Sequence, residues 1–203
     1  TLTKLDGTAM EKMVEKPKYG GVFTTVFPWA PFYFDEISGG AYNAHTLSLT
    51  NECLFIGDWS KGPAGNGETD WLLQTIPGPH LRTSAVAESW ELAGADTLVF
   101  HIRKGVRFHD KPPANGREAT ADDVAFSLER LYKTPTSYQY AMAPWKTNFE
   151  SITAPDKRTV VVKCLPGKVG AVFEMLLFYV RIVPRDMVEK YGNLSDWKNA
   201  CGT

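Results

Sequence analysis

Two histidines and two adjacent aspartates, all within residues 98–131, are the side chains of this sequence best suited to acid–base chemistry. His101 and His109 could serve as general bases, and Asp122 and Asp123 as a pair of catalytic carboxylates. Adjacent side chains on a helix point about 100° apart, however, and carboxylates in the first turn of a helix are stabilised by its dipole. We therefore interpret both aspartates as structural. The histidines receive the same interpretation, because no nucleophile stands in a sharp turn beside them.

Other kinds of reactive or binding site find little support in the sequence. The three cysteines have no CxxC spacing and the four histidines lack the spacing of zinc ligands, so we expect neither a metal nor a cofactor. Buried free cysteines are the preferred interpretation, with one disulfide left open as an alternative. The glycine-rich run KGPAGNGE lacks the ending of a phosphate-binding loop. A net charge of −1 offers no basic surplus for binding nucleic acid.

Large aromatic side chains in or beside loops are the remaining candidates for a site. They are Trp29, Phe32, Tyr33, Tyr138, Tyr140, Trp145 and Tyr179. Tyrosine and tryptophan offer apolar contact and a hydrogen-bonding tip with few rotors to fix, which suits a ligand-binding wall. Such rings also cap hydrophobic cores, and the residues alone leave both interpretations open.

Strands and helices must position these side chains, and the sequence mixes them without a regular βαβ alternation. We expect strands over residues 19–27, 98–102, 106–109, 158–165 and 179–183, and helices over residues 41–55, 120–133, 168–178 and 185–191. The second and third of these strands form a hairpin through the turn Lys104–Gly105. Residues 57–71 and 136–149 are predicted to be loops. The fold class is therefore α+β, with a mostly antiparallel sheet and flanking helices.

The helix after Thr120 has the clearest signals. Thr120 stands at the N-cap position with Asp123 three residues later, as in a short capping box. The predicted apolar stripe consists of Val124, Leu128, Leu131 and Tyr132. Arg130 and Lys133 suit the negative end of the helix dipole, and Pro135 ends the helix.

Four short motifs in a fixed order resemble the signature of the family 5 extracellular solute-binding proteins, which are the peptide- and nickel-binding components of ABC importers. The motifs are AESW at 87–90, FHIR at 100–103, GVRFH at 105–109 and TADDVAFS at 120–127. The similarity extends from about Tyr19 to the last residue, and the ordered set is specific to the family. The loop KPPANGREA and the insertion GDWSKGPAGNGETDW depart from the family pattern.

The resemblance implies that the chain is the N-terminal part of a two-lobed, periplasmic-binding-protein-like clamshell, a fragment without the second lobe. It implies a flexible lead at 1–18, the opening strand and helix of the hinge lobe at 19–58, an inserted subdomain of the first lobe at 59–183, and a truncated return toward the hinge lobe at 184–203. The signature residues then form the frame of the subdomain and have no catalytic role.

By the same resemblance, the ligand-binding residues are expected at Trp29, Tyr33, Tyr138, Tyr140, Trp145, Tyr179 and Arg181. The guanidinium of Arg181 would bind a ligand carboxylate through its planar fork. The expected function is the capture of a peptide-like or other small solute outside the membrane, for delivery to the permease subunits of an ABC importer.

The resemblance also implies a periplasmic or extracellular protein. We expect a monomer from which the signal peptide has been removed, attached to the cell surface as a lipoprotein. Its lipid anchor would be its one contact with the membrane. Two alternative functions stay open: a hydrolase that uses Asp122 and Asp123 or His109, and a protein-interaction module.

Overall fold

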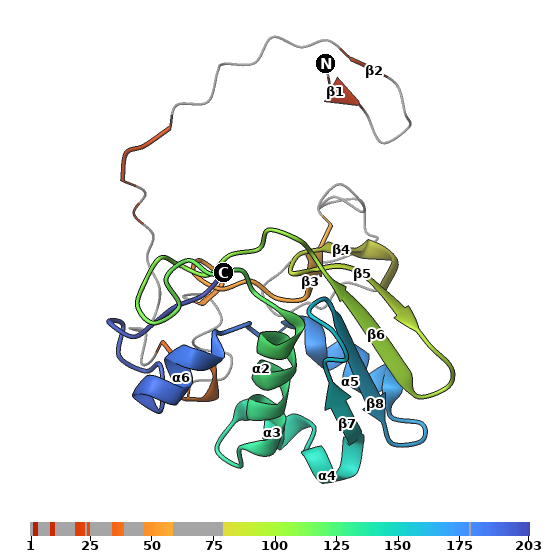
Figure 1. Cartoon of the computed structure of the whole chain (residues 1–203). Coiled ribbons are helices and arrows are strands. Elements are labelled where there is room, and N and C mark those ends of the chain that lie inside the picture. The colour runs from red at the N-terminus through yellow and green to blue at the C-terminus, as the bar shows by residue number, and fades with distance from the viewer. Residues whose placement is uncertain are drawn as a thin grey trace.

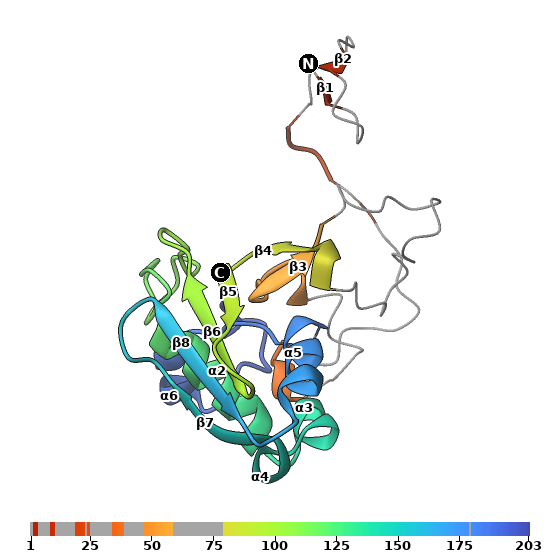
Figure 2. The same ribbon diagram turned by 90° about the vertical axis from the view of Figure 1, so that its right-hand side faces the viewer.

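The structure, a computed structural model of the chain, describes residues 2–3, 9–10, 19–22, 24, 34–38, 47–58, 79–178 and 180–203. In chain order these residues form β1 (Leu2–Thr3), β2 (Ala9–Met10), η1 (Glu36–Ser38), β3 (Phe55–Gly57), η2 (Pro79–Leu81), β4 (Arg82–Ser84), β5 (Ala87–Leu92), β6 (Thr97–Ile102), α2 (Ala121–Lys133), α3 (Tyr138–Met142), α4 (Trp145–Asn148), β7 (Phe149–Thr153), β8 (Thr159–Cys164), α5 (Val169–Phe178) and α6 (Arg185–Tyr191). The main body is an antiparallel sheet in the order β5-β6-β8-β7, with α2 and α5 packed against it (Figures 1 and 2). The predicted α+β class is confirmed. No helix in the described ranges combines the length and the apolar character of a membrane span.

The hydrophobic core lies on one face of this sheet. Strand β6 buries Leu98, Phe100 and Ile102 and leaves the residues between them partly exposed, which is the period of a half-buried strand. It pairs with β5 along one edge and with β8 along the other. The strands predicted over 98–102 and 158–165 are therefore confirmed as β6 and β8.

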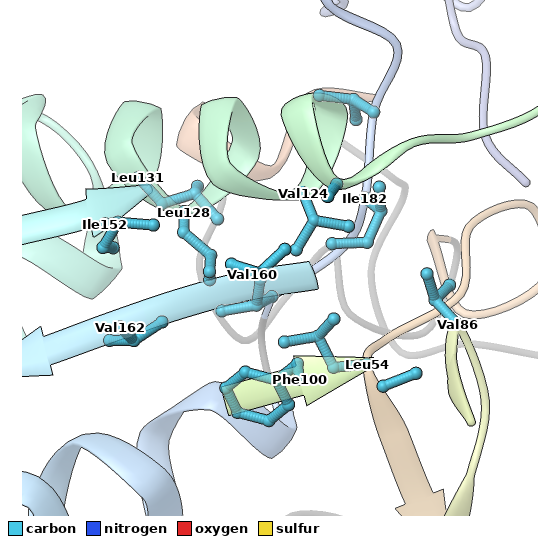
Figure 3. Close-up of a cluster of buried hydrophobic side chains, with 14 of the residues drawn as sticks. Leu54, Val86, Phe100, Val124, Leu128, Leu131, Ile152, Val160, Val162 and Ile182 are labelled. Carbon is cyan, nitrogen blue, oxygen red and sulfur yellow. The ribbon is translucent and has the colours of Figure 1, made fainter. Parts of the chain in front are cut away.

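Helices α2 and α5 cover the core. Helix α2 contacts β7 and β8, and α5 contacts β3, β6 and β8. All four residues of the apolar stripe predicted for α2 are buried, and Figure 3 shows Val124 and Leu128 reaching from α2 toward Val160 of β8. Full burial of one such aliphatic side chain contributes about 1.5–3 kcal/mol to stability. The helices predicted over 168–178 and 185–191 are confirmed as α5 and α6.

The predicted hairpin is wrong in its second half. The chain turns after β6 at Gly105, which adopts a φ of +83°, but residues 106–109 do not pair with β6. Phe108 instead donates its N–H to the carbonyl of Arg117 (3.1 Å). Strands β5 and β8 already occupy both edges of β6, so no edge is left for a hairpin partner.

The helix predicted over 41–55 is wrong at its C-terminal end. Phe55–Gly57 is strand β3, which pairs antiparallel with β4, whereas residues 41–46 lie outside the described residues. The strand predicted over 19–27 is wrong for residues 19–22 and 24, which the structure describes and which form no strand, whereas the loop predicted over 57–71 lies mostly outside the described residues.

Two further expectations need correction. Residues 180–183 form no strand. Their N–H groups donate to acceptors on different segments of the chain and not to one neighbouring strand: Ile182, for example, donates to the carbonyl of Glu52 (3.1 Å). The loop predicted over 136–149 contains the two short helices α3 and α4 and the first residue of β7.

Helix α2 begins where the sequence predicts. Its carboxylate at the third helical position, Asp123, accepts hydrogen bonds from the N–H (3.0 Å) and the hydroxyl (3.1 Å) of Thr120. This is the part of the capping box in which the third residue reaches back to the N-cap residue. The helix ends at Lys133, before Pro135, as expected.

The guanidinium of Arg117 binds two carboxylates at once. Its Nη1 and Nη2 donate to the two oxygens of Asp123 (2.8 and 2.7 Å), and its Nε and Nη2 donate to the two oxygens of Asp186 (3.1 and 3.0 Å). Asp186 lies in the first turn of α6, so one side chain joins the loop before α2, the start of α2 and the start of α6. The hydrogen bond from Arg117 is the largest cause that lowers the pKa of Asp186.

Replacing Asp123 by alanine is expected to lower the free energy of unfolding by about 2 kcal/mol, because it removes an N-cap interaction and two charge-assisted hydrogen bonds. The matched control is Asp122→Ala in the same helical turn. Asp122 is exposed, so its loss should change the free energy of unfolding by less than about 0.5 kcal/mol. Urea unfolding of both variants measures the difference, and equal midpoints would contradict the assigned role of Asp123.

Candidate functional site

The two adjacent aspartates do not form a pair of catalytic carboxylates. Both oxygens of Asp123 accept hydrogen bonds from Arg117, and its side chain is only 3% exposed. Asp122 is exposed on the outside of the same turn. The structural interpretation of this pair agrees with the geometry.

The two histidines contact other residues. His109 is exposed, and its Nδ1 accepts a hydrogen bond from the N–H of Gly202 (3.4 Å). His101 lies on the partly exposed face of β6, where its Nε2 is 3.6 Å from a carboxylate oxygen of Glu91. Among the described residues, no cluster of three histidine, cysteine or acidic side chains could hold a metal ion.

The three cysteines are buried and free, in agreement with the preferred interpretation. Burial raises the pKa of Cys53 to about 11, and it raises the pKa of Cys164 to about 11 as well. A thiol with such a pKa is protonated at neutral pH and is a poor nucleophile.

A second bidentate ion pair fixes the short helix η1 against α2. The guanidinium of Arg130 donates to both oxygens of Asp35 (2.8 and 2.6 Å), and Asp35 also accepts the N–H of Leu194 (2.8 Å). Burial acts to raise the pKa of Asp35, but the hydrogen bond and the charge of Arg130 outweigh it, so the pKa is lowered. The carboxylate therefore stays ionised in the interior.

The neighbouring Glu36 joins η1 to the segment after α5. Its Oε2 accepts the backbone N–H of Arg181 (2.6 Å), and the guanidinium of Arg181 contacts the sulfur of Cys53. Both side chains are buried, and Arg181 is 8% exposed. Burial raises the pKa of Glu36 well above its ordinary value, although the charge of Arg181 acts in the opposite direction.

The residues predicted to bind ligand are distributed over this region. Tyr138 and Tyr140 lie half-buried on α3, which packs against η1, and η1 in turn contacts Arg181 through Glu36. Trp145 is half-buried at the start of α4, where its ring stacks on Phe149 (5.2 Å between centroids) below the Nζ of Lys133 (4.1 Å). The other predicted residues, Trp29, Tyr33 and Tyr179, lie outside the described residues.

Two open hollows lie on other parts of the described surface. One, of about 350 Å³, lies between β5 and α5, and another, of about 400 Å³, lies beside the exposed Arg103, Lys104 and Arg107. None of the predicted ligand-binding residues lines either hollow.

The sequence reasoning missed three acidic residues that organise this region, namely Asp35, Glu36 and Asp186. The partners of Asp35 and Glu36 are 95 and 145 residues away in the sequence, so no local pattern indicates the pairs. The only signal in the sequence was the position of Asp35 and Glu36 directly after the aromatic residues Phe32, Tyr33 and Phe34.

Glu36→Gln should stabilise the protein increasingly as the pH rises. A carboxyl group whose pKa is raised in the folded state costs stability above its unfolded pKa, which is near 4.5, and this cost grows until the folded pKa is reached. Glutamine keeps an oxygen that can accept the N–H of Arg181 but does not ionise. Urea unfolding at about pH 5 and about pH 8 measures the effect. The exposed control Glu88→Gln should show no such trend, and a pH-independent effect of Glu36→Gln would contradict the prediction.

Comparison with known proteins places the chain in a family. Residues 83–200, more than half of the chain, match the bacterial extracellular solute-binding proteins, family 5, in the part described as Middle. The dipeptide-binding protein of Escherichia coli is 35% identical over 128 residues, covering 62% of this chain and 20% of that protein. Di/tripeptide-binding protein 2 of Pseudomonas aeruginosa is 41% identical over 86 residues, covering 36% of this chain and 15% of that protein. The chain thus spans a fifth or less of the length of these relatives.

Solved structures agree with this fold. The periplasmic binding protein DppA from Helicobacter pylori, in complex with the peptide STSA, has a TM-score of 0.60 at 20% identity and covers 84% of this chain and 33% of its own. Haemophilus influenzae OppA, in complex with RPPGFSPFR, has a TM-score of 0.58 at 22% identity and covers 85% of this chain and 32% of its own. At these identities the likeness concerns the fold. Together with the match over residues 83–200, it shows that the chain belongs to family 5 of the bacterial extracellular solute-binding proteins.

Proposed function

We propose that this protein captures a peptide-like or other small solute outside the membrane, as the substrate-binding component of an ABC importer. The observation that carries the proposal is the family match over residues 83–200. Relatives described as dipeptide- and di/tripeptide-binding proteins support a peptide-like solute. Other similar proteins widen the range of possible solutes. One relative is described as heme-binding protein A, and one solved structure is of a complex with mannopinic acid.

The proposed architecture is one part of a two-lobed receptor. The chain covers about a third of the solved neighbours, 33% of one and 32% of another, which supports this division. We assign residues 1–18 to a lead, 19–58 to the hinge lobe, 59–183 to the inserted subdomain of the first lobe, and 184–203 to the return toward the hinge lobe. Closure of two lobes around a ligand is a known way to signal binding.

The proposed ligand wall consists of Trp29, Tyr33, Tyr138, Tyr140, Trp145, Tyr179 and Arg181. Half-buried rings on the short helices α3, which packs against η1, and α4 support this assignment, because they offer rigid apolar surface. Arg181 is packed against Cys53 and is 8% exposed, so it can bind a ligand carboxylate only if its guanidinium leaves that contact.

A hydrolase is not favoured by the described structure. The two oxygens of Asp123 accept hydrogen bonds from Arg117, and His109 is exposed and accepts a hydrogen bond from the backbone of Gly202. Members of the family are solute-binding proteins, in agreement with a non-catalytic role. The proposal includes partner permease subunits, a monomeric receptor, and attachment of a mature lipoprotein to the cell surface in the periplasm or outside the cell.

In the full-length receptor, Trp145→Ala is expected to weaken binding of the dipeptide Met-Leu, the ligand of a similar solved protein. Loss of an aromatic ring from a binding wall costs about 1–2 kcal/mol, which corresponds to roughly a 10-fold increase in Kd. The matched control is Trp197→Ala, because the side chain of Trp197 is 64% exposed on the C-terminal turn. Titration calorimetry of both variants tests the assignment, and equal affinities would contradict it.

The 203-residue chain by itself is expected to bind Met-Leu with a Kd of about 1 mM or weaker, because a two-lobed receptor shares its binding cleft between both lobes. Calorimetry on the isolated chain measures this affinity. Micromolar binding would contradict the division into two lobes, although it would leave the solute-binding function intact.

A further inference from the structure

Glu36 and Arg181 meet where the short helix η1 contacts the segment that follows α5. One carboxyl oxygen of Glu36, Oε2, accepts the backbone N–H of Arg181 (2.6 Å). The other oxygen, Oε1, is buried, and within the described part of the chain it has no hydrogen-bond partner. Most buried polar atoms of native proteins have such a partner. Oε1 is therefore an acceptor to which a neighbouring donor can move.

The backbone at Arg181 is fixed on both sides. The N–H of Arg181 is bound by Glu36, and the N–H of the next residue, Ile182, donates to the carbonyl of Glu52 (3.1 Å). Ile182 also belongs to the core cluster drawn in Figure 3. The guanidinium of Arg181 contacts the sulfur of Cys53. A change of partner by this guanidinium therefore involves the side chain and leaves the backbone in place.

The charges of the two side chains act on each other across this contact. Burial raises the pKa of Glu36 well above its ordinary value, although the positive charge of Arg181 acts to lower it. Glu36 therefore stays neutral to a higher pH than an exposed glutamate does, and it ionises as the pH rises further. A carboxylate binds a guanidinium through charge-assisted hydrogen bonds, which are stronger than those of a neutral carboxyl group.

Other charged or titratable groups act in the same region. They are Asp35 on η1, Arg130 and Tyr132 on α2, and Cys53 before β3. Asp35 and Arg130 are bound to each other by two hydrogen bonds (2.8 and 2.6 Å). Burial raises the pKa of Tyr132, and it raises the pKa of Cys53 to about 11, so both groups stay neutral near pH 7. Helix α3, which also packs against η1, carries no charged side chain. Ionisation of Glu36 is therefore the main change of charge here.

We propose that Glu36 is a positioning residue for Arg181 and makes capture of the solute carboxylate dependent on pH. While Glu36 is neutral, the guanidinium of Arg181 can leave Cys53 and bind the carboxylate of the solute. Once Glu36 is ionised, its Oε1 binds the guanidinium and holds it in the interior, so the solute has to compete with Glu36. The inference rests on the proposed function, in which Arg181 belongs to the ligand wall.

The direction of the pH effect follows from the linkage between binding and protonation. When the guanidinium of Arg181 binds the solute carboxylate, Glu36 loses a stabilising positive charge. The pKa of Glu36 is then higher in the complex than in the free receptor, so that binding takes up protons. The affinity is highest below the pKa of Glu36 in the free receptor, and it falls as the pH rises through that value.

Titration calorimetry of the full-length receptor with Met-Leu, the dipeptide bound by a similar solved protein, measures the effect. Between about pH 5.5 and about pH 7.5 the Kd should rise at least about 3-fold, and buffers of different ionisation enthalpy should reveal proton uptake. Glu36→Gln should bind with one Kd at both pH values, because glutamine does not ionise. The exposed control Glu88→Gln should keep the pH dependence of the unmodified receptor.

Arg181→Gln separates positioning from direct contact between Glu36 and the solute. Its Kd should be higher and should no longer change with pH, because Glu36 acts through the guanidinium. PH dependence retained in Arg181→Gln would overturn the positioning role. A Kd of the unmodified receptor that is the same at both pH values, or equal pH dependence in Glu36→Gln, would overturn the inference and leave solute binding supported. Absence of Met-Leu binding at either pH would reject both this inference and a dipeptide as the solute.

Discussion

The planar guanidinium of Arg117 is the constraint on which the arrangement of α2 and α6 depends. It satisfies two carboxylates with four hydrogen bonds and so fixes the starts of α2 and α6 relative to the loop that follows β6. The carboxylate of Asp123, whose side chain is 3% exposed, needs such a partner, because an ionised group without one is costly in the interior. Helix α2, held in this way at its N-terminus, lays its apolar stripe across β7 and β8.

A second guanidinium, that of Arg130, repeats this arrangement near the other end of α2. It binds Asp35 and thereby brings η1 and the backbone of Leu194 to the helix. Helix α2 is thus tied at both ends to segments distant in the sequence. The charged groups of Arg117, Arg130, Asp123 and Asp35 hold this frame together, and the rings that we propose for contact with a ligand lie half-buried on α3 and α4.

Local signals explain which parts of the fold could be predicted from the sequence. Helix α2 has its cap, its apolar stripe and its stop within about four turns of chain, so every signal needed is local. The hairpin after β6 failed because the pairing of β6 with β8 joins segments about 60 residues apart, and no turn sequence reveals that both edges of β6 are occupied.

The candidate site was predictable to a smaller extent. The family could be inferred from four ordered motifs, which the match over residues 83–200 agrees with. The burial of Arg181 against Cys53 and the contact of its backbone with Glu36 depend on residues 128 and 145 positions away, so the ligand contact that the family resemblance implied for Arg181 carried no sign of this burial. Tertiary packing decides whether a charged side chain faces solvent, and local patterns do not contain that information.

The most direct test of the account is a double-mutant cycle between Arg117 and Asp186, measured by urea unfolding of Arg117→Met, Asp186→Asn and the combined variant. Because both side chains are about one-third exposed, 35% and 33%, their coupling is reduced by solvent. The account predicts a coupling energy of about 1 kcal/mol between the loop before α2 and the start of α6. Additive effects of the two substitutions, within about 0.3 kcal/mol, would contradict the claim that this ion pair holds the frame together.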